Sequence, residues 1–351
     1  YVADKPSSVV VEYAGPLRTT VCVKGRFLGD DNNKFQYIAR VTAWAGKSYV
    51  HVKYSLANSN PDNYCYRLVK DSTIALKLAA ATESAVLGAS KPLEVASDAW
   101  MQQSARSYKT AIHKNDTFSW AKWYHGSTQP DACVAMAGGK KLWGSAPAQA
   151  LSNPPGAVKP TEVAEGWLSA GGVFVTDLFF VEDPPRRMAV AKDSILLTGV
   201  TEPLEGTTKL PFAQKTRMLF DCSHLSSQYV IDVAAGDNAA CSRLARLARS
   251  RLHAMAEPAW YFDSEQLPVG KFGTQADELA CYKQWGWAYE QKDVPTGPVD
   301  IMARVTRWTC GDDNHFTSEQ DTVDALLLMY LRTGGQGFLA AAESWVNYFM
   351  D

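Results

Sequence analysis

The first half of the chain shows the alternation of apolar and polar residues that is typical of β-strands. It is clearest in YVHVKYSL at residues 49–56, where valine and tyrosine fall on one face and histidine, lysine and serine on the other. Residues 9–13, 18–24 and 35–44 are likewise rich in β-branched and aromatic residues. Short polar stretches containing Gly, Asp and Asn separate these segments. The pattern predicts antiparallel strands in a sandwich or a barrel.

The strand pattern continues to about residue 225, with one interruption. Residues 126–160 are richer in Gly, Pro, Ala and Ser, and we predict a loop-rich insertion there. Further strand character is found at residues 66–82, 103–125, 172–180, 188–191, 194–200 and 215–221. We therefore expect an antiparallel β-sandwich domain over residues 1–230.

Beyond residue 230 the apolar residues repeat at helical spacing. Four helices are predicted, over residues 237–256, 275–291, 317–334 and 337–349. The third has the clearest start, because Thr317 and Gln320 match a capping box before an apolar run. Helices joined by glycine-containing turns fit the start of an α/α toroid. We expect this helical domain to occupy residues 231–351 and to be truncated, because a toroid needs further hairpins to close.

The composition excludes several classes of function. Apolar residues make up 46% and charged residues 21% of the chain, which is ordinary for a globular protein. The net charge of −2 argues against a nucleic-acid partner, and no stretch is apolar enough to span a membrane. The seven cysteines are scattered without a CxxC pair, so we expect no metal and no cofactor. The chain lacks a start methionine and a signal-like segment, and Tyr1 is expected to be an internal or processed start.

Several segments, taken in their order along the chain, resemble one family. They are EYAGPLR at 12–18, WAG at 44–46, PAWY at 258–261, and the stretch from Asn314-His315 to Gly335. These resemble the exo-rhamnogalacturonan lyases and their YetA-like relatives. The resemblance implies a central β-sandwich followed by an α/α toroid, without the family's N-terminal barrel. It also implies a secreted or extracellular protein that acts on a polysaccharide or oligosaccharide, with missing flanking domains or self-association covering exposed helix faces.

The activity implied by this resemblance is that of a polysaccharide lyase, which cleaves rhamnogalacturonan-like, uronate-containing glycans by β-elimination. Such a reaction needs a base, an acid and a group that neutralises the sugar carboxylate. We expect His315 to act as base or acid, Tyr289 to donate a proton and Arg307 to neutralise the carboxylate. The residues expected to bind substrate are Trp287, Trp308, Asn314, Glu319 and Asp321.

Two other functions fit the same residues. A glycoside hydrolase would need two carboxylates about 5–10 Å apart, and Asp312 with Glu319 or Asp321 would be the first candidates. A protein without catalytic activity could bind glycans or build a surface structure through its aromatic residues, of which 11 are tryptophan and 15 tyrosine. An aromatic surface without converging ionisable groups would favour this binding function.

Overall fold

The fold is taken from a computed structural model of the chain. It describes residues 1–30, 34–59, 67–105, 130–144, 164–180, 186–201, 217–219, 224–234, 236–249, 256–264, 322–333, 339 and 342. The chain divides into two compact units, Tyr1–Arg251 and Leu252–Asp351.

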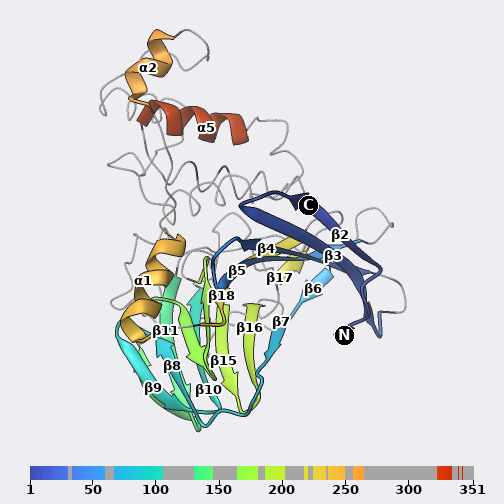
Figure 1. Cartoon of the computed structure of the whole chain (residues 1–351), viewed down its shortest axis with the longest axis vertical. Helices are drawn as coiled ribbons and strands as arrows, with labels where there is room; N and C mark the ends of the chain where they lie inside the picture. The colour runs from blue at the N-terminus through green and yellow to red at the C-terminus, as the bar shows by residue number, and fades with distance from the viewer. Residues whose placement is uncertain are drawn as a thin grey trace, which may run out of the picture. The chain divides into compact units, whose positions relative to one another are not determined.

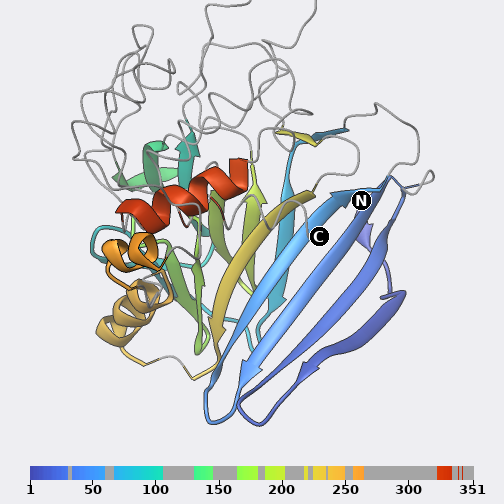
Figure 2. The ribbon, with the colours of Figure 1, turned by 90° about the horizontal axis from the view of Figure 1, so that it is seen from above.

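The first unit contains a ten-stranded antiparallel sheet, whose blue strands β2 to β5 lie side by side in Figure 2. Nine of its strands follow the order β1-β3-β4-β5-β18-β14-β13-β8-β9, and β2 pairs with β3. Their bounds are β1 Val2–Ala3, β2 Ser8–Ala14, β3 Arg18–Leu28, β4 Phe35–Trp44, β5 Tyr49–Asn58, β18 His224–Asp232, β14 Val173–Asp177, β13 Trp167–Ala170, β8 Ser84–Gly88 and β9 Pro92–Ala96.

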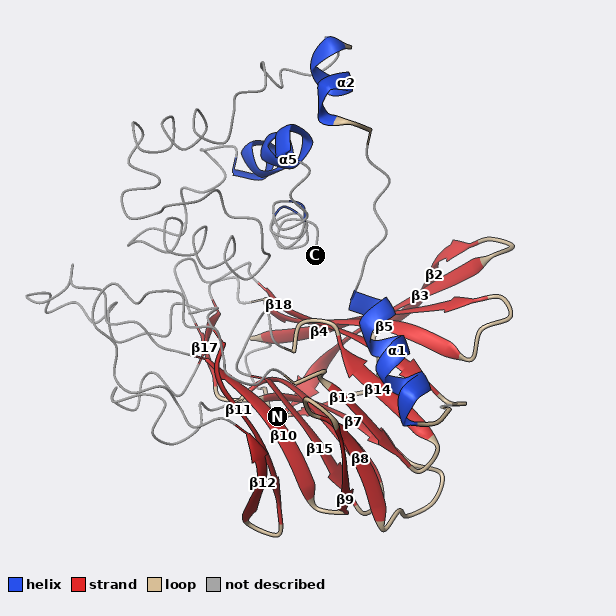
Figure 3. Cartoon of the chain, turned by 90° about the vertical axis from the view of Figure 1, so that its left-hand side faces the viewer, coloured by secondary structure: helices blue, strands red, loops and turns tan. Residues whose placement is uncertain are grey.

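A six-stranded antiparallel sheet forms the second layer, in the order β12-β11-β10-β15-β16-β7 (Figure 3). Its strands are β12 Lys140–Gly144, β11 Pro130–Ala137, β10 Ala99–Ala105, β15 Arg186–Ala191, β16 Ser194–Val200 and β7 Ser72–Lys77. Strands β11 and β12 lie within residues 126–160, for which the sequence predicted a loop-rich insertion. A separate small sheet pairs β17 Arg217–Leu219 with β6 Arg67–Val69.

The hydrophobic core lies between the two large sheets. Leu168 of the ten-stranded sheet is fully buried in one cluster with Met101, Met188 and Leu197 of the six-stranded sheet. Each such side chain contributes about 1.5–3 kcal/mol when it is removed from water. Two sheets joined in this way form a β-sandwich, as Figure 1 shows.

The pairing of β5 with β18 brings together two segments that are far apart in the sequence. The register runs from Ala57 opposite His224 to Tyr49 opposite Asp232. On the other side of β18, Asp232 pairs with Phe174 of β14. The end of β18 therefore lies between the β4–β5 turn and β14, and its last residue is an acid.

Helix α1, Asn238–Arg249, begins a few residues after β18. The carboxylate of Asp237 accepts a hydrogen bond of 2.8 Å from the amide of Ala240, which caps the helix. Its buried residues Cys241 and Ala245 pack in one cluster with Trp167 and Phe174 of the ten-stranded sheet. Helix α1 thus covers the outer side of the sandwich and belongs to the first unit, although the sequence predicted it to open the helical domain.

The predicted incomplete α/α toroid is wrong. The fold described is almost entirely antiparallel sheet, and among the described residues α1 buries its apolar side against strands of the ten-stranded sheet. In the second unit, the described helices are α2, Pro258–Asp263, and α5, Thr322–Thr333, which are in contact. These short elements do not make a repeated array of hairpins. None of the described helices is both long and apolar enough to cross a membrane.

Candidate functional site

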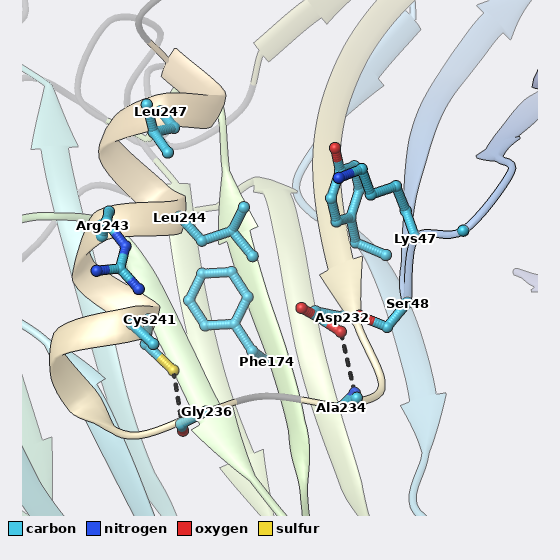
Figure 4. Close-up of a pocket in the computed structure, with 13 residues that line it drawn as sticks. Lys47, Ser48, Phe174, Asp232, Ala234, Gly236, Cys241, Arg243, Leu244 and Leu247 are labelled. Carbon is cyan, nitrogen blue, oxygen red and sulfur yellow. Dashed lines mark hydrogen bonds between the residues drawn. The ribbon is translucent and has the colours of Figure 1, made fainter. Parts of the chain in front are cut away.

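A pocket of about 340 Å³ opens between α1, the end of β18 and the β4–β5 turn (Figure 4). All of its lining residues belong to the first unit. They are Gly46, Lys47, Ser48, Tyr49, Phe174, Asp232, Ala234, Gly236, Ala240, Cys241, Arg243, Leu244 and Leu247. Its volume lies within the range of about 300–1,000 Å³ that is usual for sites that bind small molecules.

Asp232 places a carboxylate at the pocket wall. The residue is 8% exposed, and its Oδ1 accepts a hydrogen bond of 2.9 Å from the amide of Ala234. Among the described residues, Oδ2 has no hydrogen-bond or ion-pair partner. The carboxylate is therefore fixed through one oxygen, while the other is left as an acceptor for a ligand.

An apolar wall lies opposite Asp232. Phe174 is fully buried beneath the pocket, with its ring centroid 5.9 Å from that of Trp167. Leu244 and Leu247 extend from α1 above it, and Leu247 is 63% exposed (Figure 4). Large apolar side chains at such exposure are available to cover the non-polar part of a ligand.

The β4–β5 turn forms the other rim of the pocket. Gly46 has a φ of +71°, a left-handed conformation that glycine adopts without strain. The amide of Lys47 donates a 3.2 Å hydrogen bond to the carbonyl oxygen of Trp44. The carbonyl oxygen of Ser48 in turn accepts a hydrogen bond of 3.4 Å from the amide of Val233. These backbone bonds fix Lys47 and Ser48 close to Asp232.

Two cationic side chains line the pocket without an ion partner. Neither Lys47 nor Arg243 makes a side-chain hydrogen bond or an ion pair within the part of the chain that is described. Arg246, one turn further along α1, differs because its Nη1 lies 3.7 Å from Oε1 of Glu165. The cations at the pocket are thus available to an anionic group of a ligand.

Cys241 also reaches the pocket, but its chemistry is unfavourable for catalysis. Burial raises the pKa of the thiol, and the nearby carboxylates of Asp232 and Asp237 raise it further. The thiol donates to the carbonyl oxygen of Gly236 at 3.7 Å. Because the thiolate is the reactive form, a thiol held protonated is a packing residue.

A second group of ionisable residues lies inside the sandwich and not at the pocket. Nη1 of Arg186 lies 3.3 Å from Oδ2 of Asp177, and both side chains are at most 2% exposed. Burial raises the pKa of Asp177, and the positive charge of Arg186 opposes part of that rise. Burial likewise raises the pKa of Tyr229 well above its usual range. With so little solvent access, these groups join the two sheets and are not available to a ligand.

The site residues predicted from the sequence lie outside the described residues. This holds for His315, Tyr289 and Arg307, the expected catalytic residues, and for Trp287, Trp308, Asn314, Glu319 and Asp321, the expected substrate-binding residues. The prediction did not include Asp232, Lys47 or Arg243. One signal that could have found Asp232 is a single acid at the end of the apolar run YVIDV, shortly before a helix.

Comparison with known proteins gives no family. No protein-family model and no curated protein matches the chain. A galactose mutarotase related enzyme from Lactobacillus acidophilus is similar at 11% identity and a TM-score of 0.26, over 64% of this chain and 71% of that one. A protein assigned as an aldose 1-epimerase from Escherichia coli K12 is similar at 8% identity and a TM-score of 0.26, over 64% and 68%. Similarity at this level supports no argument about activity.

The resemblance to exo-rhamnogalacturonan lyases is therefore wrong. Neither a family model nor a curated protein connects the chain to them, and the incomplete toroid that the resemblance implied is not what the described residues form. The physical reason is that the matching strings, such as EYAGPLR and WAG, are short strand-edge and turn sequences. Many unrelated antiparallel sheets need the same residue types at those places.

Proposed function

We propose that the first unit is a carbohydrate-binding β-sandwich and that the pocket beside α1 holds one sugar residue. The observation that carries this proposal is the carboxylate of Asp232, fixed through Oδ1 and open at Oδ2. An ionised carboxylate is an acceptor only, and the hydroxyl groups of a sugar are donors. A hydrogen bond to a charged, buried acceptor is stronger than one between neutral groups in water.

The apolar wall supports the same ligand. A sugar ring has non-polar C–H faces besides its hydroxyl groups, and it needs both kinds of contact. Leu244 and Leu247 offer the apolar contact on one side, while Asp232 and Ser48 offer polar groups on the other (Figure 4). A mostly apolar cavity with a few polar groups at fixed positions is the usual form of a site for a small ligand.

Binding is better supported at this pocket than hydrolysis. A glycoside hydrolase of the usual kind needs two carboxylates on either side of the scissile bond. Among the described residues that line the pocket, Asp232 is the single carboxylate. The proposal therefore concerns recognition of a sugar.

Isothermal titration calorimetry tests the proposal. The full chain is titrated with the methyl glycosides of galactose, glucose and mannose, with the corresponding acidic sugars, and with their oligosaccharides. Asp232→Asn keeps an oxygen for the amide of Ala234 and replaces the free acceptor by a donor. We expect at least one sugar to bind, and this substitution to weaken it about tenfold, since a hydrogen bond to a charged group contributes about 1.5–3 kcal/mol.

Asp193→Asn is the matched control, because Asp193 lies on the surface with Lys77, away from the pocket residues. It should leave the affinity unchanged. If no sugar in the panel binds, or if both substitutions act alike, the proposal fails.

A further inference from the structure

The charges around the pocket indicate which kind of sugar it takes. Lys47 and Arg243 contribute two positive charges and Asp232 one negative charge, which leaves a net charge of +1 among the lining residues. Neither cation has an ion partner in the described part of the chain. A neutral sugar would use Asp232 and leave the cations unused.

We propose that the pocket selects an acidic sugar, a hexuronate residue, whose carboxylate binds to Arg243, while the positive charge of Lys47 strengthens the attraction. This inference rests on the proposed function, and it names the ligand class of the same site. The guanidinium of Arg243 can bind a carboxylate through two parallel hydrogen bonds, a geometry that planar carboxylates match well. The ammonium of Lys47 adds a second positive charge from the opposite rim.

Asp232 fixes the orientation of such a ligand. Its negative charge repels the carboxylate of a hexuronate and attracts the hydroxyl groups. The ligand carboxylate therefore binds towards Arg243 on α1, and the ring hydroxyls face Oδ2 of Asp232 on the other side of the pocket (Figure 4). A site that combines an attractive and a repulsive group in this way distinguishes ligands as well as binding them.

The experiment compares each acidic sugar with its neutral counterpart by calorimetry, at low and at physiological salt. The probes are the methyl glycosides of galacturonic and glucuronic acid against those of galactose and glucose. We expect at least one acidic sugar to bind about tenfold or more tightly than its neutral counterpart. The preference should shrink as salt is added, because the cations lie near the surface and are screened.

Arg243→Gln and Lys47→Gln test the assignment of the cations. Each should reduce the preference for the acidic sugar over its neutral counterpart, and both together should abolish it. Arg246→Gln is the control on the same helix, since Arg246 does not line the pocket. It should leave the preference intact.

The possible failures are distinguishable. Equal affinity for acidic and neutral sugars would overturn this inference and leave the proposed function standing. A preference that survives in the double variant would overturn the assignment of Arg243 and Lys47. An absence of binding to every sugar would overturn the inference together with the proposed function.

Discussion

The guanidinium of Arg186 lies 3.3 Å from the carboxylate of Asp177, in the space between the two sheets. Arg186 belongs to β15 and Asp177 to β14, so the pair joins the layers of the sandwich. Nη1 of Arg186 also donates to Oγ of Ser227 at 3.0 Å, and Oδ1 of Asp177 accepts from the amide of Phe179 at 2.9 Å. Replacing only one residue of such a buried, hydrogen-bonded ion pair strongly lowers the free energy of unfolding, because the other charge is left buried without a partner.

Arg186→Met is therefore expected to lower the free energy of unfolding by about 3–5 kcal/mol, because it leaves the buried carboxylate of Asp177 without its cation. Urea denaturation followed by circular dichroism measures the change. Lys77→Met is the control, since Lys77 pairs with Asp193 on the surface, and exposed pairs contribute little. Equal effects of the two substitutions would contradict the structural role given to Arg186.

Tyr229 makes the stability sensitive to alkaline pH. Burial raises its pKa in the folded state above the value of about 10 that is usual for tyrosine. A raised folded-state pKa means that its contribution is fully present below about pH 10 and is lost as the pH rises further. The free energy of unfolding should thus fall above pH 10, with a slope of up to about 1.4 kcal/mol per pH unit from this residue.

Urea midpoints measured from pH 8 to 11.5 test this dependence. Tyr229→Phe should make the decline shallower without removing it, because burial also raises the pKa of Tyr37 and Tyr54. A decline that is the same in the wild type and in Tyr229→Phe would show that Tyr229 is not its source.

Two turn glycines with similar backbone conformations, one at the pocket and one away from it, allow the role of the β4–β5 turn in binding to be tested. Gly46 at the pocket has a φ of +71°, and Gly138 in the β11–β12 turn has a φ of +53°. A Cβ atom at either position would meet nothing within 4 Å, so alanine would be strained by backbone conformation alone. Gly46→Ala and Gly138→Ala should each cost about 1 kcal/mol of stability.

Only Gly46→Ala is expected to weaken sugar binding, by several-fold, because a change in the turn displaces Lys47 and Ser48. Calorimetry on both variants, with unfolding midpoints measured in parallel, separates the two effects. A loss of affinity in Gly138→Ala as large as that in Gly46→Ala would count against the β4–β5 turn as part of the site.

The strands that are clearest in the sequence are those with regular alternation or many β-branched residues. Strand β4 has the predicted bounds, Phe35–Trp44, and β5 starts at the predicted Tyr49. Strand β18 was not predicted, although it is central in the sheet, because its first residues are the polar HLSSQ. Its pairing with β5 joins residues more than 160 positions apart. Local patterns carry no information about partners at that separation.

The candidate site was not predictable for a related reason. Asp232, Lys47 and Arg243 come from a strand end, a turn and a helix, and only the order of the strands brings them together. The sequence-based prediction favoured the polar stretch around His315, because several ionisable residues are close together there along the chain. A pocket that is lined by single residues from distant elements has no cluster of ionisable residues in the sequence by which it could be predicted.

The most direct test of the central claim is to locate the bound sugar by nuclear magnetic resonance. Backbone amide shifts of the full chain are recorded during titration with the tightest-binding methyl glycoside. We expect the largest changes at Lys47, Ser48, Ala234 and Arg243, which line the pocket. Changes that cluster elsewhere, for example around Trp100 and Arg187 on the six-stranded sheet, would contradict it.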